Sequence, residues 1–308
     1  MPGIITIAQG SNRYIEMAKM LAFSLIQTNP DIKRAVISDA PETEFEGLFD
    51  IYIPYNSSYG DGFSQKLCLD KYSPFEETLF IDADCLVVKS LNDAIRFFKP
   101  HQFAVFGDQI STGEWYMDVA AMCKKFNVPS IPLFNGGVYY FKRGETATNI
   151  YTTAREIRDQ YFQIEIDDFR GSMADEPLMA IAMAINKVEA VDDQALIMRT
   201  PIGINGALKI DVLNEVCAFD KQGEKAEPAI MHFAGAYSIA FHYKREIAKL
   251  KLLKVSTPLL NKKLVSLFIN GTYNVSYGSY VFCKRVLKVI LRGEKFDFTN
   301  WLPIYSNL

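Results

Sequence analysis

Short apolar runs alternate with longer amphipathic segments along the first third of the chain. Buried strands are predicted for the apolar runs at 4–8, 35–38, 51–53 and 78–82. Apolar residues near helical spacing predict a helix over 14–27, and another is expected to begin within 63–69. Strands that alternate with helices predict an open α/β sheet, mainly parallel, with helices on its faces. Such sheets bind ligands beyond the carboxyl ends of their strands, where Asp39 and Asp82 fall.

The second half of the chain adds three shorter signals. A glycine turn at 136–137 leads into an apolar, aromatic strand over 138–141. Asp175 is predicted to cap an apolar helix over 178–185, because an aspartate at an N-cap accepts free amide hydrogens. The run 230–233 predicts a short strand that ends near an imidazole.

Composition places the chain among folded globular proteins. Of its 308 residues, 49% are hydrophobic and 22% charged, which fits one large α/β domain with an appendage, or two domains. Five scattered cysteines without a Cys-x-x-Cys speak against a disulfide framework or a zinc cluster and favour a reducing compartment. Neither a signal peptide nor an apolar run of about 18 residues is visible, so a cytoplasmic protein is expected.

Basic residues concentrate toward the carboxyl end. From Tyr243 onward there are 12 Lys/Arg and 3 Asp/Glu, a balance of +9, whereas the first 242 residues hold 21 and 33, a balance of −12. This predicts a catalytic domain over 1–242 and a basic helical region over 243–308. Amphipathic basic helices either lie on the inner face of an anionic membrane or pack on the preceding domain. Nucleic acid is not an expected partner, because no binding motif accompanies the charge.

The acidic pair Asp82 and Asp84 is set between two apolar runs. Side chains two residues apart on a strand point the same way, so both carboxylates are expected to face one crevice. Two like charges are costly to bury without a cation, and oxygen ligands suit a hard divalent metal. The pair therefore predicts a metal site rather than a solvated turn.

Four motifs occur in a set order along the chain: Asp82-Ala83-Asp84, Phe134-Asn135-Gly136-Gly137-Val138, Asp175-Glu176 and His232-Phe233-Ala234-Gly235. This order resembles the glycogenin-like, family 8-type nucleotide-sugar glycosyltransferases, which have the GT-A fold. The resemblance covers roughly residues 4–240 and includes Lys66, ahead of the Asp-x-Asp strand.

The resemblance implies a metal-dependent glycosyltransferase that uses a nucleoside-diphosphate sugar, with a UDP-sugar as the expected donor, and retains the anomeric configuration. It implies Asp84 and His232 as direct ligands of Mn²⁺ or Mg²⁺, with Asp82 touching the metal, the ribose or both. On chemistry alone, His232 could instead be a hydrogen-bonded core histidine. The acceptor would be a glycan or a lipid-linked sugar.

The same resemblance suggests which residues meet the substrates. Donor binding is predicted for Ala8, Tyr14, Asp39, Lys66, Asp82, Gly136, Gly137 and Gly235. A catalytic role near the reacting carbon is predicted for Asn135, Asp175 and Glu176. Simpler interpretations stay open: Lys66 as a surface lysine, Tyr14 as a core tyrosine, and Asn135 as part of a turn.

Two positions depart from the family's pattern. Ser238 stands six residues after His232, where the family usually has a lysine that contacts the diphosphate; Lys244 or Arg245 is a candidate substitute. Glu176 stands where the family commonly has glutamine. Because of both departures, the resemblance does not fix the identity of the donor or of the acceptor.

Other functions compete with this interpretation. A haloacid-dehalogenase-type phosphatase also places Asp-x-Asp after an apolar strand, but its motif wants Thr or Val where Leu86 stands. A non-catalytic scaffold that binds a nucleotide sugar is a further alternative. Within the GT-A class, an inverting enzyme would use a carboxylate such as Asp175 or Glu176 as its base.

Overall fold

A computed structural model describes residues 2–167, 173–194, 196–255 and 261–292. The chain divides into two compact units. Unit 1 comprises Met1–Cys85 and Leu91–Gln194, and unit 2 comprises Leu86–Ser90 and Ala195–Leu308. The functional division after residue 242 stays a prediction.

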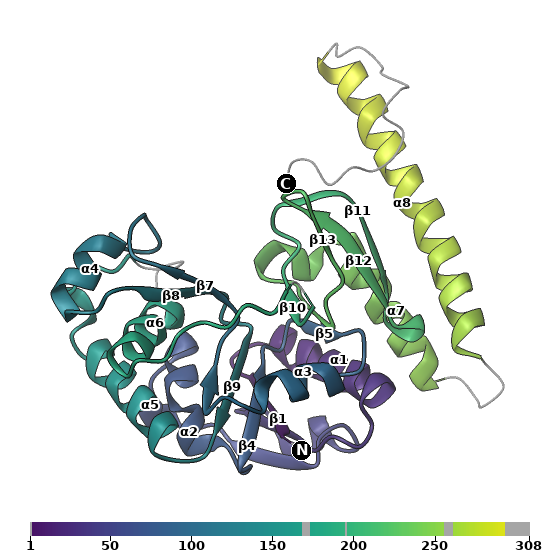
Figure 1. Ribbon diagram of the computed structural model, residues 1–308. Helices are drawn as coiled ribbons and strands as arrows, with labels where there is room; N and C mark the ends of the chain where they lie inside the picture. The colour runs from purple at the N-terminus through teal and green to yellow at the C-terminus, as the bar shows by residue number, and fades with distance from the viewer. Residues whose placement is uncertain (1, 168–172, 195, 256–260, 293–308) are drawn as a thin grey trace. The chain divides into compact units, whose positions relative to one another are not determined.

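Unit 1 is built on a six-stranded sheet with the strand order β3-β2-β1-β4-β9-β6. Figure 1 labels β1, β4 and β9 of this sheet. Four of its strands are parallel: β1 (Gly3–Ala8), β2 (Arg34–Ser38), β3 (Ile51–Pro54) and β4 (Glu77–Ile81). Two antiparallel pairings extend the sheet past β4, through β9 (Val138–Lys142) and β6 (Phe103–Ala104). The predicted mainly parallel α/β sheet is confirmed, and Asp82 lies directly after β4.

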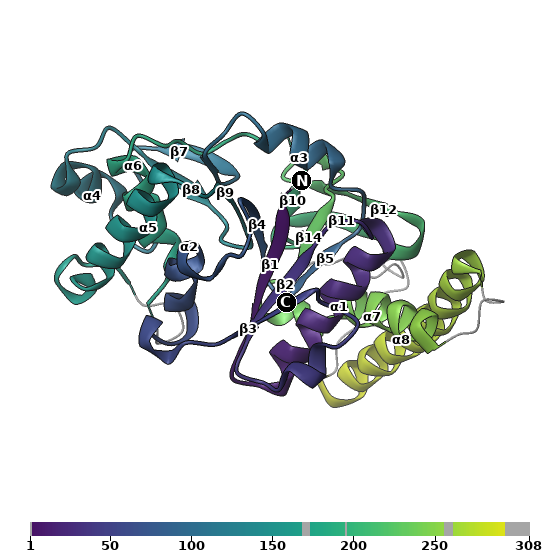
Figure 2. The same ribbon diagram turned by 90° about the horizontal axis from the view of Figure 1, so that it is seen from below.

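Helices cover this sheet. The described α-helices of unit 1 are α1 (Asn12–Thr28), α2 (Leu69–Tyr72), α3 (Asn92–Phe98), α4 (Val119–Phe126), α5 (Glu145–Arg158) and α6 (Asp175–Ile185). Figure 2 shows α1 beside β1 and β2, which it contacts. The helix expected to begin within 63–69 is a 3-10 segment, η3 (Gly62–Cys68), that runs into α2. A separate antiparallel pair consists of β7 (Gly107–Ile110) and β8 (Ile131–Phe134).

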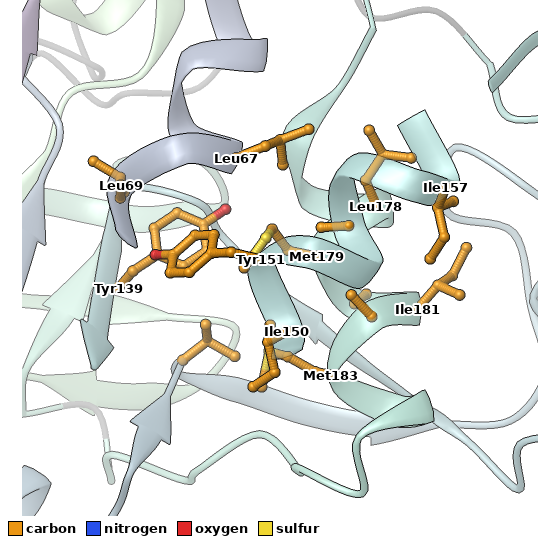
Figure 3. Packing of buried hydrophobic residues seen from close by; sticks show 14 of the residues in the cluster. Leu67, Leu69, Tyr139, Ile150, Tyr151, Ile157, Leu178, Met179, Ile181 and Met183 are labelled. Carbon is orange, nitrogen blue, oxygen red and sulfur yellow. The ribbon is translucent and has the colours of Figure 1, made fainter. Parts of the chain in front are cut away.

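The core of unit 1 lies where α5 and α6 pack together near η3 and β9 (Figure 3). Tyr139 of β9 and Tyr151 of α5 are almost completely buried there. Residues 178–183 of α6 are buried without exception, so this helix is apolar around its whole circumference. Burial of each large apolar side chain contributes about 1.5–3 kcal/mol, which holds α6 firmly against α5 and β8.

The described part of unit 2 contains two small sheets and two long helices. One sheet has the order β10-β14-β5, formed by β10 (Met198–Arg199), β14 (Ile230–His232) and β5 (Cys85–Val87). The other is antiparallel and is formed by β11 (Ile204–Asp211), β12 (Val216–Lys221) and β13 (Glu224–Ala226). The predicted carboxyl-terminal helices are α7 (Phe241–Val255) and α8 (Lys262–Arg292). No helix in the described part of the chain has the length and apolarity needed to cross a bilayer.

An internal ion network ties α7 to the end of β11. Glu246 is fully buried and accepts hydrogen bonds from the Val212 amide (2.9 Å) and from Lys249 Nζ (2.8 Å). Lys249, also fully buried, lies 3.1 Å from Asp211 Oδ2. Arg245 Nε donates to Glu246 at 3.1 Å. Arg245 and Lys249, which the sequence pattern assigned to a basic amphipathic face, are therefore internal partners of carboxylates and add nothing to a solvated face.

Candidate functional site

Lys66 and Asp82 form the centre of a polar cluster at the carboxyl end of β4. Lys66 Nζ, on η3, donates to Asp82 Oδ2 at 2.7 Å and to the Gly136 carbonyl at 3.1 Å. The Asp82 amide in turn donates to the Gly137 carbonyl at 2.9 Å. Lys66 is only 8% exposed, so it is not a surface lysine. These contacts bind the end of β4 to the glycine turn that precedes β9.

The first turn of α6 adds two carboxylates to the cluster. Asp175 Oδ2 lies 3.6 Å from Lys66 Nζ and accepts a 2.7 Å hydrogen bond from the Tyr139 hydroxyl. Glu176 Oε1 accepts a 2.6 Å hydrogen bond from the Gly136 amide. The predicted cap is wrong: Asp175 lies inside the helix, the N-cap is Ala174, and no side chain caps the amides. The Asp175 carboxylate is turned toward the cluster instead.

The turn between β8 and β9 is shaped by the same contacts. Asn135 Oδ1 accepts from the Gly137 amide at 3.2 Å, so the turn interpretation of this residue is confirmed. A Cβ on Gly136 would lie 2.9 Å from Asp175 Oδ2 and 3.0 Å from the Tyr139 hydroxyl oxygen. Only glycine fits at this position without displacing a neighbour.

The electrostatics of the cluster favour the charged form of Lys66. Burial lowers the pKa of Lys66, but the nearby Asp175 and Asp82 carboxylates outweigh it, and the pKa stands above its usual value. The ammonium also lies 5.4 Å from the centre of the Phe80 ring. Lys66 faces the carboxylates of Asp82, Asp175 and Glu176, so the described cluster holds more negative than positive charge. Such an excess suits a ligand or an ion with positive charge.

Three residues predicted to bind the donor lie at the same edge of the sheet. Ala8 ends β1, and its carbonyl accepts a 2.5 Å hydrogen bond from the Ser38 hydroxyl. Asp39 follows β2, and its two carboxylate oxygens lie 3.2 and 3.0 Å from the Gly10 amide. Tyr14, in the first turn of α1, is 48% exposed, so it is not a core tyrosine. Because β1, β2 and β4 are parallel, these residues and Asp82 share the carboxyl edge of one sheet.

The remaining predicted residues are divided between the two units. Asp84 lies in unit 1, in the turn between β4 and β5. His232, the last residue of β14, is 5% exposed and belongs to unit 2. Gly235, also in unit 2, begins a 3-10 segment with a φ of +62°. The joint role of Asp84 and His232 as metal ligands stays a prediction.

Sequence reasoning missed Tyr139. Its position in an apolar strand suggested an ordinary core aromatic, yet its hydroxyl reaches a carboxylate 36 residues away in the chain. Burial and the neighbouring Asp175 and Glu176 carboxylates hold its pKa well above the usual value, so the hydroxyl remains a donor. A phenolic group in a run of buried strand positions is the one signal that could have identified it.

The fold is that of the GT-A glycosyltransferases, with which the chain superposes. The galactosyltransferase LgtC, solved in complex with donor and acceptor sugar analogs, superposes with a TM-score of 0.55 at 16% identity, over 83% of this chain and 98% of its own. An active-site mutant of LgtC gives the same TM-score at 17% identity, with the same coverage of both chains. The bifunctional glycosyltransferase WbbM gives 0.50 at 10% identity, over 88% of this chain and 51% of its own. The sequence itself matches no protein-family model and no curated protein.

Proposed function

We propose that this protein is a metal-dependent glycosyltransferase that moves a sugar from a nucleoside-diphosphate sugar to an acceptor. The observation on which the proposal rests is the cluster of Lys66, Asp82 and Asp175 at the carboxyl edge of a GT-A sheet. Buried titratable groups grouped around one cation are typical of catalytic sites. The LgtC complex with donor and acceptor sugar analogs supports the class of substrate.

The donor is proposed to be a UDP-sugar. Its nucleoside would bind at the edge formed by Ala8, Tyr14 and Asp39, where the half-exposed Tyr14 ring offers a surface for stacking. Its sugar would lie nearer Lys66 and the turn at 135–137. Gly136, Gly137 and Gly235 are proposed to offer backbone contacts to the donor.

The residues fit a divalent metal. Carboxylates exceed cations in the cluster, and oxygen ligands with a single imidazole suit Mn²⁺ or Mg²⁺. Asp84 immediately precedes β5, and β5 neighbours β14, which ends at His232; this supports Asp82, Asp84 and His232 as the ligand set. A metal in this place would neutralise the charge that develops on the leaving diphosphate.

The protein's own groups hold the reactants in place. Lys66 fixes Asp82 and Asp175 relative to each other and offsets part of the negative charge that these carboxylates would present to an anionic donor. Asn135, Asp175 and Glu176 are proposed to meet the transferred sugar near the reacting carbon. The resemblance favours retention of the anomeric configuration and a glycan or lipid-linked acceptor. The GT-A fold speaks against the phosphatase, and no observation favours a non-catalytic scaffold.

A thermal-shift series tests the donor site without knowledge of the acceptor. Ligands that bind only the folded state raise the melting temperature by mass action. UDP-glucose, UDP-galactose and the matching GDP-sugars would each be added with and without MnCl₂. We expect a shift of a few degrees that needs both metal and Asp84 and is lost in Asp84→Asn. The control is Asp93→Asn, whose carboxylate is 95% exposed on α3. An equal shift in both variants would remove the support for Asp84 as a ligand.

We further propose that the region 243–308 contacts an anionic membrane surface from the cytoplasmic side. Its sequence has a balance of +9, although the buried Arg245 and Lys249 add no exposed charge. One stripe of α8 exposes four apolar side chains: Leu264 (58%), Leu267 (72%), Phe268 (62%) and Val275 (71%). Vesicles of phosphatidylserine and phosphatidylcholine would be floated with the full chain. Leu267→Glu should float less than Ile202→Glu, which changes a residue 54% exposed outside α8. Equal flotation of the two variants would count against this surface.

A further inference from the structure

The packing around Tyr139 fixes the position of its ring. Its ring lies between those of Phe80 (centroids 5.8 Å apart) and Phe134 (5.7 Å), and only 1% of the residue is exposed. On β9 it pairs in register with Phe80 of β4. The hydroxyl at the end of this fixed ring donates to Asp175 Oδ2 at 2.7 Å.

A hydrogen bond and an ion pair meet at that one carboxylate oxygen. Lys66 Nζ lies 3.6 Å from the same Oδ2, so a cation and a neutral hydroxyl approach one side of the Asp175 carboxylate. A carboxylate held at one oxygen by a buried hydrogen bond and a buried ion pair has little freedom to rotate. The other oxygen, Oδ1, is then the one that a sugar hydroxyl or a reacting carbon would meet.

Gly136 leaves just enough room for this arrangement. A methyl group at this position would come within 3.0 Å of the Tyr139 hydroxyl oxygen and within 2.9 Å of Asp175 Oδ2. The Gly136 amide is itself held by Glu176. The phenol, the carboxylate and the turn therefore fix one another's positions.

We propose that Tyr139 is a positioning residue that orients Asp175 for glycosyl transfer, an inference that rests on the proposed function. It acts through the hydrogen bond to Oδ2 and does not itself touch the substrates. Its removal should therefore slow the transfer step while donor binding is kept, because the groups proposed to bind the nucleotide lie elsewhere on the sheet edge.

The next residue of β9 supplies a matched control. Tyr140 is also 1% exposed, and its hydroxyl also meets a carboxylate, Glu77 Oε2, at 3.2 Å. Successive strand residues point to opposite faces, so this second hydroxyl lies away from the cluster. Tyr139→Phe and Tyr140→Phe each remove one oxygen atom and keep the ring.

The experiment measures steady-state release of UDP from the UDP-hexose that the wild type turns over, with MnCl₂ present. Tyr139→Phe should lower kcat about tenfold or more and leave KM for the donor within about twofold, whereas Tyr140→Phe should change neither. In an Asp175→Asn background, Tyr139→Phe should cause no further loss, because it acts through that carboxylate. Both tyrosine variants should melt within a few degrees of the wild type.

Four results would overturn the inference: equal kcat for the two tyrosine variants, a loss confined to KM, an additive loss in the double variant, or a Tyr139→Phe protein that melts far below Tyr140→Phe. The failure of the proposed function is distinct, since the wild type would then release no UDP from any UDP-hexose. In that case the positioning role falls with the function.

Discussion

Lys66 and Asp82 form a 2.7 Å ion pair in which the lysine side chain is 9% exposed and the aspartate side chain 22%. The same ammonium lies 3.6 Å from Asp175, which joins the end of β4 to the start of α6. Residues 66, 82 and 175 are far apart in the chain, so this one cation brings together three separate segments of unit 1. Removal of the Lys66 ammonium should therefore lower both the stability and the activity of the protein.

Lys66→Met should lower the free energy of unfolding by about 3–5 kcal/mol, because it leaves buried carboxylates without their cation. Lys33→Met is the control: Lys33 pairs with Asp50 at 2.8 Å, but its side chain is 70% exposed, so the cost should stay below about 1 kcal/mol. Urea unfolding of the two variants measures the difference. Equal losses would show that the Lys66 pair is no more important for stability than a surface one.

Gly136→Ala should reduce both stability and donor turnover, because the added methyl would press on Asp175, Tyr139 and Glu176. We expect a loss of about 1–3 kcal/mol, typical of overpacking. Gly271→Ala is the control, and it should change the stability in the opposite direction. Gly271 lies in α8 with open space where a Cβ would stand, so alanine there should stabilise the protein by up to about 1 kcal/mol. Thermal melts of both variants measure the change in stability. A Gly136→Ala protein as stable as the wild type would contradict the close packing of the turn.

Stability should also depend on pH through His242. Burial, together with the nearby Arg245 and Lys249 cations, lowers the pKa of His242 to about 3. The unfolded chain, with a histidine pKa of about 6.5, takes up this proton first as the pH falls. The stabilisation is therefore fully present above about pH 6.5 and is lost between about 6.5 and 3, by about 1.4 kcal/mol per pH unit.

His242→Gln removes this titration. The free energy of unfolding of the variant should fall less steeply with decreasing pH over that range than the free energy of the wild type. Denaturant unfolding at pH 7, 6, 5 and 4 measures both slopes. Parallel curves would mean that His242 is not buried in its neutral form.

Local sequence pattern was sufficient to predict five of the six strands in the large sheet of unit 1; β6 was not predicted. The runs at 4–8 and 78–82 are apolar, short and bounded by polar segments, and β1 and β4 match them to within one residue. The position of Asp82 at a strand end followed directly, because strand ends and ligand sites coincide in parallel sheets.

The local sequence pattern could not predict contacts between segments that are distant in the chain. The capping rule for Asp175 depends only on neighbours, whereas the actual partner of its carboxylate is Tyr139, on another element. The local pattern also could not show that Lys249 of the expected basic face is internal, since it pairs with Asp211, which lies on β11. A local rule cannot detect partners that only the folded chain brings close.

The most direct test of the proposed function is UDP or GDP release from a panel of sugar nucleotides in the presence of Mn²⁺. Wild type and Asp93→Asn should turn over the same donor at similar rates. Asp82→Asn and Asp84→Asn should each lose about a hundredfold or more, because charge on the leaving diphosphate would be poorly neutralised. No turnover of any donor by the folded wild type, or full activity in both Asp82→Asn and Asp84→Asn, would contradict the account.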